Sequence, residues 1–424
     1  MTLNKSAVTE LRAAFPALQQ TIDGRPIIFL DGPGGTQVHG SVIDAMGRYL
    51  VEANSNAHGA FAYSRRTDAT VRAAREAMAD FVNASRPEEI VFGPNMTTLT
   101  FNASRAIGRT LAPGDEIVVT RLDHDANIAP WVALEEKGVI IRHVDFDPAD
   151  CTLDMAGLEA AINPRTRVVA LGYASNAVGS INDVARAAEL AHAAGAWLYV
   201  DAVHYAPHGP IDVQALGCDL LVCSMYKFFG PHVGALYGRY DVLDVLQAYK
   251  VRPAGDDPPD KFETGTQSFE ALAGATAAVD YLASVGRRFG RDLAGGWPEF
   301  EGRRRDLKAS LSAIQAYERS LCEQLVAGLR AIPGLRIYGI VDPARFDARV
   351  PTVSFTLEGW TAPEISRRLG EANVFAWAGN FYALAVTERL GLEGRGGLLR
   401  VGLAHYNTAE EVDILLGLLD DLPR

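Results

Sequence analysis

The chain has 424 residues, of which 48% are hydrophobic and 22% are charged. This balance is typical of a globular protein and excludes an intrinsically disordered chain, because it leaves ample apolar surface to bury. Lysine and arginine number 40 against 52 aspartates and glutamates, so the net charge is −12. Such an acidic chain does not indicate nucleic acid or an anionic membrane as its main partner. The length predicts two or three domains.

The chain ends and the cysteines predict a cytoplasmic protein. No apolar segment follows residues 1–6, so we expect no secretory signal. No run of about 18 apolar residues occurs, so we expect no transmembrane helix. The four cysteines form no C-x-x-C pair and are too few for a disulfide framework.

Short apolar runs alternate with helical patterns through most of the chain. The expected strands, in chain order, are residues 27–30, 90–92, 116–120, 139–144, 167–171, 197–200 and 220–223. These runs lack polar alternation, which is typical of a parallel sheet that is buried on both faces. A helical pattern at 182–192 ends near Gly195. The alternation predicts a doubly wound α/β domain over residues 25–285.

The composition changes near residue 286, where glycine and arginine become frequent. Beyond it, helical patterns alternate with strands such as 353–357, and the chain ends in an expected helix at 409–422. We therefore expect a smaller α+β domain over 286–424, which is joined by the N-terminal segment 1–24.

Two residues that follow neighbouring strands suggest a specific cofactor chemistry. Asp201 ends the run 197–200, and Lys227 follows the run 220–223. Ligands of open α/β sheets bind at the carboxyl ends of the strands. A partly desolvated lysine can condense with an aldehyde, and a carboxylate beside a pyridine nitrogen can keep that nitrogen protonated. This pair is the minimal apparatus for pyridoxal 5'-phosphate (PLP), although each residue alone is compatible with a structural role.

Other polar residues also follow expected strands. Ser224 and the pair Thr97 and Thr98 could form a phosphate cup, although such hydroxyls are often only helix caps. His124 could stack on a flat cofactor, and Asn176 could donate to a phenolate oxygen.

The order of these motifs resembles the class V aminotransferase family of fold type I PLP enzymes, and its cysteine desulfurase-like branch in particular. The matching segments are 29–31, 97–98, 124–131, 175–179, 200–202, 224–227 and 400–408. The resemblance implies a large, mostly parallel α/β domain with a smaller C-terminal α+β domain. It also implies a homodimer that acts on a small amino-acid substrate.

The resemblance assigns a role to each matching residue. Lys227 would be the Schiff-base lysine and proton shuttle. The remaining cofactor contacts would come from Asp201 at the pyridinium nitrogen, His124 on the ring, Asn176 at the phenolic oxygen, and Thr97, Thr98 and Ser224 at the phosphate. Thr266 would reach the phosphate in the partner subunit, Arg400 would bind the substrate carboxylate, and His58 would lie near the substrate.

The chain also departs from this family. Desulfurases need a mobile cysteine in a loop that would align near residues 376–382, and no cysteine follows Cys322. His204 stands where the family usually has a glutamine, after the aspartate motif. It could form a hydrogen bond with a cofactor oxygen, act as an acid–base group or only pack beside Asp201. Tyr226 stands where the family usually has a histidine, directly before the lysine, and it could still bind phosphate. The same loop contains Trp377, Phe381 and Tyr382, which suggest an apolar second-substrate pocket or simple packing.

These observations predict a PLP-dependent lyase that acts at the β-carbon of a small amino acid. A sulfinate or carboxylate group could leave without a thiol acceptor, with possible carbon–carbon bond formation to an aldehyde. An aminotransferase, an amino-acid racemase or epimerase, and a non-catalytic PLP-binding protein remain alternatives. Residues 224–227 also read as the S-x-x-K string of serine acyl hydrolases, but the S-D-N and K-T-G elements of that class do not occur. Sequence strings typical of dinucleotide-binding dehydrogenases, P-loop NTPases and metal sites are also missing from the sequence.

Overall fold

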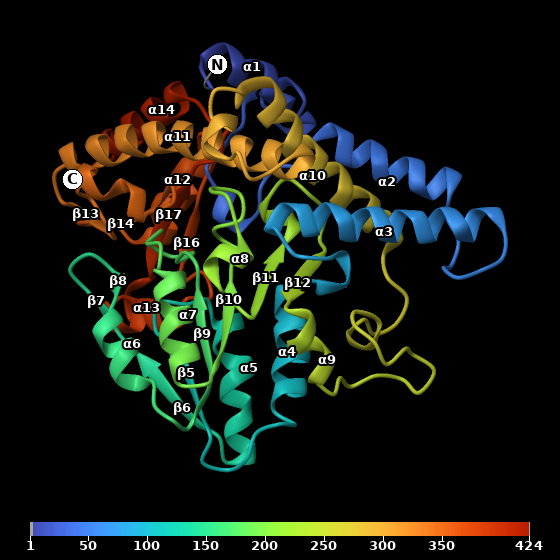
Figure 1. Ribbon diagram of the computed structural model, residues 1–424. Helices are drawn as coiled ribbons and strands as arrows, with labels where there is room; N and C mark the ends of the chain where they lie inside the picture. The colour runs from blue at the N-terminus through green and yellow to red at the C-terminus, as the bar shows by residue number, and fades with distance from the viewer. Residues whose placement is uncertain (1–2, 424) are drawn as a thin grey trace.

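The larger of the two main sheets has seven strands and is mostly parallel (Figure 1). The computed structural model describes residues 3–423. The spatial order is β4 (Ile90–Gly93), β12 (Gly234–Gly238), β11 (Leu220–Ser224), β10 (Trp197–Asp201), β9 (Thr166–Gly172), β5 (Glu116–Thr120) and β6 (Ile140–Val144). Strands β5, β6, β9, β10 and β11 run parallel, whereas β12 is antiparallel to both of its neighbours. This architecture confirms the predicted α/β fold class.

Helices cover this sheet and extend beyond it on one side (Figure 1). They are α2 (Gly40–Glu52), α3 (Ala62–Val82), α4 (Met96–Ile107), α5 (Ala129–Val132), α6 (Met155–Ala161), α7 (Val184–Ala193), α8 (Val213–Leu216), α9 (Tyr240–Val245) and α10 (Phe269–Phe289). The long helix α10 packs against α2 and α3 and also against α11 (Gly302–Ala331). It therefore connects the two halves of the molecule.

The second sheet has four antiparallel strands and lies in the C-terminal half. Its order is β13 (Leu335–Tyr338), β14 (Thr352–Leu357), β17 (Leu398–Gly402) and β16 (Trp377–Gly379). The nearby helices are α11, α12 (Ala362–Glu371), α13 (Leu384–Arg389) and α14 (Ala409–Asp420), with α1 (Lys5–Ala13) near the start of the chain. A separate apolar core, which includes Leu325, Phe355, Leu399 and Leu415, lies between this sheet and its helices.

Most of the expected strands occur within a residue or two of their predicted bounds, with two corrections. The run 27–30 does not join the large sheet, because β3 (Ile28–Phe29) pairs with β15 (Val374–Phe375) in the C-terminal half. The run 139–144 is not buried on both faces, because β6 is an edge strand and most of its residues are partly or fully exposed. The expected domain boundary at residue 286 falls inside α10.

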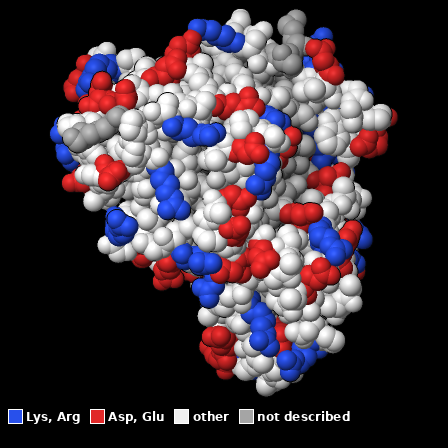
Figure 2. Space-filling view, turned by 90° about the vertical axis from the view of Figure 1, so that its left-hand side faces the viewer, with Lys and Arg blue, Asp and Glu red and all other residues white. Residues whose placement is uncertain are grey.

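Charged side chains of both signs are interspersed on the face that includes the left-hand side of Figure 1 (Figure 2). Such mixing avoids a single-sign field on this face. Within residues 3–423, no helix is both long and apolar enough to cross a membrane.

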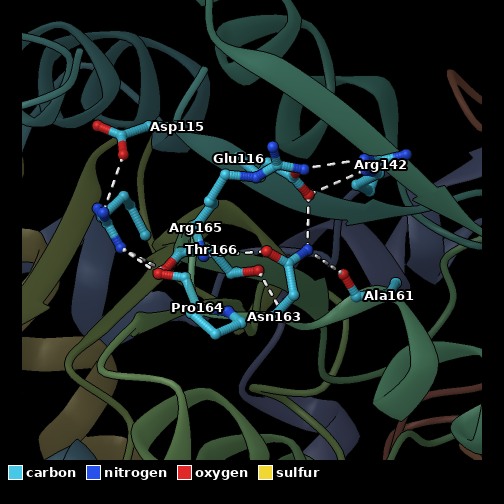
Figure 3. Close-up of polar contacts among 9 residues, drawn as sticks. Asp115, Glu116, Arg142, Ala161, Asn163, Pro164, Arg165 and Thr166 are labelled. Atoms are coloured by element: carbon cyan, nitrogen blue, oxygen red, sulfur yellow. Dashed lines mark hydrogen bonds and ion pairs between the residues drawn. The ribbon is translucent and has the colours of Figure 1, made fainter. Parts of the chain in front are cut away.

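A buried carboxylate ties three strands together at the edge of the sheet where their amino ends lie. Glu116, at the start of β5, is fully buried and accepts hydrogen bonds from Arg142, Arg165 and Asn163 (Figure 3). The Arg142 and Asn163 donors lie 2.9 and 2.8 Å from its Oε2 atom. These hydrogen bonds lower the pKa of Glu116 to about 2, and the hydrogen bond from Arg142 is the largest cause. The network stabilises the edge of the sheet that lies opposite the carboxyl ends of β10 and β11.

We expect Glu116→Gln to lower the free energy of unfolding by about 2 kcal/mol, because charge-assisted hydrogen bonds are lost. Chemical denaturation measures this loss, and Glu189→Gln, in an exposed ion pair with Arg186, should change little. Because the pKa of Glu116 is lower in the folded protein than in the unfolded chain, its ionised carboxylate stabilises the fold at pH values above about 4.5. This stabilisation is lost as the pH falls towards 2. The difference between the wild type and Glu116→Gln should therefore shrink below pH 4.5, and a constant difference would contradict this account.

Candidate active site

A large cavity of about 1020 Å³ lies where the carboxyl ends of β5, β9, β10 and β11 face the second sheet. Eight of the predicted site residues line it: Thr97, His124, Asn176, Asp201, His204, Tyr226, Lys227 and Arg400. Residues that are far apart in the sequence therefore meet at one edge of the sheet, as expected for an open α/β fold.

Asp201 and Lys227 are positioned by the ends of β10 and β11. The Asp201 carboxylate accepts a hydrogen bond of 2.9 Å from the Val203 amide, and the Lys227 amine donates to the Pro33 carbonyl. Burial raises the pKa of Asp201 to about 6. Burial, with Arg400 nearby, lowers the pKa of Lys227 to about 7, while Asp201 opposes this shift. The lysine amine is thus close to half neutral at neutral pH.

Arg400 enters the cavity from β17 of the second sheet. Its Nη1 atom donates to the Asn176 carbonyl at 2.8 Å, and its Nε atom is buried without a partner in the described chain. Burial lowers its pKa to about 9, and Asp31 opposes the shift. The guanidinium therefore remains charged, and its unpartnered Nε–H is a donor that a carboxylate could satisfy.

His124 and Asn176 lie on the loops after β5 and β9. The Nδ1 atom of His124 accepts a 3.0 Å hydrogen bond from the Ala126 amide, and burial lowers the pKa of His124 to about 4. This imidazole is therefore neutral and suited to stacking on a flat ring. The Nδ2 atom of Asn176 donates to the Phe381 carbonyl, and its Oδ1 atom is buried without a partner in the described residues.

The two residues that depart from the family pattern also face the cavity. His204 is buried, and its Nε2 atom lies 2.9 Å from the Thr352 hydroxyl. Burial lowers the pKa of His204 well below its usual value, so the ring is neutral. Tyr226 stacks on His232 with ring centroids 4.7 Å apart. Both side chains are therefore fixed by neighbours that the sequence pattern did not indicate.

The residues expected at the phosphate, which lie at or near the start of α4, do not all line the cavity. Thr97 lines the cavity, whereas Thr98 and Ser224 do not. The Thr98 amide and hydroxyl both donate to the Asn95 side chain, and the Ser224 hydroxyl accepts from the Met96 amide at 3.0 Å. Thr98 and Ser224 thus organise the helix start, which is the structural alternative for such hydroxyls.

The single chain does not bring His58 or Thr266 into its own cavity. His58 lies between α2 and α3, is 91% exposed at its side chain and pairs with Asp68 at 3.4 Å. Thr266 is exposed in the segment before α10. The roles given to these residues remain predictions.

Two buried carboxylates near the site were not assigned from the sequence. Asp31 follows β3, and burial raises its pKa to about 6, while Arg400 and Lys227 limit the rise. Asp123 lines the cavity after β5 and accepts hydrogen bonds from Gly172 and Asn127, each at 2.9 Å. Asp31 directly follows the run 27–30, and Asp123 is the third residue after the run 116–120. The rule that located Asp201, a polar residue at the carboxyl end of a strand, could therefore also have found them.

Residues 28–291 and 307–415 match the family described as Aminotransferase class-V. The chain belongs to this family. Among its relatives is a probable cysteine desulfurase of Mycolicibacterium paratuberculosis, 33% identical over 96% of this chain and 57% of that protein. A cysteine desulfurase of Dickeya dadantii is 30% identical over 98% of this chain and 97% of its own length. The chain thus spans only about six tenths of some relatives and nearly all of others.

Solved structures of family members have the same fold. The apo structure of a cysteine desulfurase from Thermococcus onnurineus NA1 gives a TM-score of 0.84 with 25% identity, covering 97% of each chain. The cysteine desulfurase CsdA from Escherichia coli, in an S-sulfonic acid form, gives 0.81 with 28% identity, again over 97% of each chain. These similarities confirm the predicted fold type I architecture.

The class V family, to which this chain belongs, is a family of PLP-dependent enzymes. The cavity fits the cofactor, because Lys227 and Asp201 face the same space and the buried Asn176 Oδ1 atom lacks a partner in the described chain. Lys227, Asp201, His124 and Thr97 are the residues that would hold PLP.

We expect purified protein to absorb visible light from bound PLP, and borohydride reduction to leave a phosphopyridoxyl group on Lys227. Peptide mass spectrometry locates this group. Lys227→Ala should lose the covalent attachment, whereas Lys308→Ala should keep it, because Lys308 is buried beside Trp297 and Phe300 outside the cavity. Attachment that survives in Lys227→Ala would refute the assignment.

Proposed function

We propose that the protein is a PLP-dependent lyase that breaks a bond at the β-carbon of a small amino acid. One observation supports this most directly: Lys227, Asp201 and Arg400 share a cavity whose lining includes no cysteine. All four cysteines are buried elsewhere, and burial raises the pKa of each thiol. A buried, protonated thiol is a poor nucleophile. Transfer of sulfur to an enzyme cysteine therefore has no acceptor here.

The cavity residues can divide the chemical work among them. PLP, when bound, withdraws electrons from the α-carbon of an attached amino acid. Arg400 binds the substrate carboxylate through its Nε–Nη2 edge, and Lys227 Nζ takes the proton from the α-carbon. Asp201 holds a proton on the ring nitrogen of the cofactor. The near-neutral pKa of Lys227 suits a group that must both accept and return a proton.

The charges around the cavity favour a β-substituent that leaves by itself. Among the described lining residues, Lys227 and Arg400 are the cations, and His124 and His204 are neutral. A second acid group on the substrate therefore meets no third cation among these residues, and the same lining also includes the carboxylates of Asp125 and Glu393. An anion without a partner in an apolar environment is destabilised. Loss of this group as neutral carbon dioxide or sulfur dioxide relieves that cost.

The reaction type is tested by a panel of substrates. We expect cysteine sulfinate or aspartate, incubated with the enzyme in deuterated water, to lose sulfur dioxide or carbon dioxide and yield alanine deuterated at the β-carbon. Including an aldehyde tests carbon–carbon bond formation. NMR and mass spectrometry of the products provide the measurement.

Each alternative gives a different product. Deuterium at the α-carbon of alanine with no β-cleavage would identify a racemase or epimerase, and amino transfer to a keto acid would identify an aminotransferase. Rapid sulfide release from cysteine would contradict our interpretation of the missing cysteine. No turnover of any substrate by protein that has bound PLP would favour a non-catalytic PLP-binding protein.

We also propose a cytoplasmic homodimer in which Thr266 of one subunit reaches the cofactor phosphate of the other. Thr266 is exposed and lies outside its own cavity, which is compatible with a role in a partner's site. Apolar side chains of α2 and of the residue before α3, including Leu50, Val51 and Phe61, are also exposed, which supports a protein partner on this side. Four unpaired cysteines suit a reducing compartment.

Mixing two defective variants tests the shared site. Lys227→Ala and Thr266→Val subunits, unfolded together and refolded, should regain intact PLP sites in about a quarter of the subunits, because half of randomly mixed dimers are heterodimers with one complete site. PLP retained after dialysis is the measurement. Lys227→Ala mixed with Asp201→Asn, two changes in one subunit's own site, should recover none. Equal recovery in both mixtures would exclude a shared site.

A further inference from the structure

The segment after β16 has an unusual backbone at two adjacent aromatic residues. Phe381 and Tyr382 both have a φ of +58°, in the left-handed region that bulky side chains rarely adopt. Such a conformation persists only where the surroundings hold it, and strained positions of this kind gather at functional sites. The contacts that hold these two residues therefore indicate what they do.

Tyr382 holds the loop that carries His124. Its ring lies nearly parallel to the His124 imidazole, with ring centroids 5.5 Å apart and an interplanar angle of 14°. Its carbonyl accepts a 2.6 Å hydrogen bond from the Asp125 amide. The Tyr382 ring and carbonyl thus both contact the segment that carries the imidazole. The Tyr382 side chain is largely exposed, so the hydroxyl is not needed for this contact.

Phe381, which lies in the same segment as Tyr382, contacts both Arg400 and Asn176. The Arg400 guanidinium carbon lies 4.1 Å from the centre of the Phe381 ring. The Phe381 carbonyl accepts a 2.8 Å hydrogen bond from the Asn176 side chain, whose own backbone carbonyl accepts from Arg400. The three residues form a closed set of contacts. The aromatic face and the Asn176 carbonyl fix the guanidinium plane, and its Nε atom has no hydrogen-bond partner in the described chain.

We propose that Phe381 and Tyr382 are positioning residues that orient Arg400, Asn176 and His124 for the substrate carboxylate and for PLP. Phe381 acts on the carboxylate end of the cavity, and Tyr382 acts on the cofactor end. This inference rests on the proposed function only for the roles of Arg400 and His124, and it holds for any reaction that binds an amino acid on PLP. The loop that aligns with the expected position of a reactive cysteine instead supplies these two aromatic residues.

Four variants of the PLP-loaded enzyme separate the two supports. Phe381→Leu and Tyr382→Leu remove the rings, and Tyr382→Phe keeps the ring without the hydroxyl. Tyr240→Leu is the matched control, because the Arg86 guanidinium lies 3.9 Å from the Tyr240 ring outside the cavity. The readouts are the Kd of propionate, a carboxylate without an amine, the Kd of PLP, the visible circular dichroism of bound PLP and the thermal midpoint.

We expect Phe381→Leu to weaken propionate binding about tenfold, as for loss of a desolvated cation–π contact, and to leave the Kd of PLP within about twofold. Tyr382→Leu should weaken PLP binding and change its circular dichroism, while leaving propionate affinity at saturating PLP nearly unchanged. Tyr382→Phe should restore wild-type values, and Tyr240→Leu should change neither ligand.

The proposal fails if Phe381→Leu binds propionate as the wild type does. It also fails if both leucine variants weaken both ligands equally while lowering the thermal midpoint, because the segment would then only stabilise the fold. None of these measurements requires cleavage at the β-carbon. An enzyme that proved to be an aminotransferase would give the same binding results, so failure of the proposed function would be seen separately.

Discussion

Two buried cations in one cavity, Lys227 and Arg400, are the constraint on which the rest of the site depends. Burial penalises charge, and each cation raises the cost of charging the other. The two groups respond differently to this constraint. The pKa of the Lys227 amine falls to about 7, whereas the Arg400 guanidinium stays charged with a pKa of about 9. One group can therefore exchange a proton near neutral pH, and the other remains a permanent anchor for an anion. Asp201 and Asp31 limit the cost from opposite sides.

The same constraint explains why two sheets are needed. Lys227 and Asp201 come from the carboxyl ends of β11 and β10, whereas Arg400 comes from β17 and Asp31 from the segment after β3. Strand β3 pairs with β15, so the beginning of the chain belongs with the C-terminal half at this point. The charges balance only when both halves pack against each other. Helix α10, which contacts α2, α3 and α11, is well placed to maintain that packing.

The sequence predicts the parts of this site that follow directly from strand order. Asp201 and Lys227 could be paired because each follows an apolar run, and parallel strands end at one edge. Arg400 could be assigned only through the family resemblance, because no local pattern relates β17 to the large sheet. Thr98 and Ser224 are predicted at the phosphate, and in the structure their hydroxyls form hydrogen bonds at the start of α4. Side-chain direction at a helix start depends on which donors the cap leaves free, and residue spacing does not encode this.

The family fold does not by itself decide the fate of the β-substituent. A thiol sulfur needs a nucleophile to receive it, whereas a carboxylate or sulfinate needs only a place where its charge is poorly stabilised. In this chain, the four thiols are sequestered in apolar cores, and the segment after β16 places Phe381 and Tyr382 beside Arg400 and His124. These residues add no third cation to the described lining of the cavity. We propose that such a site binds one carboxylate at Arg400 and disfavours a second, so that the second group is lost more readily as a neutral molecule.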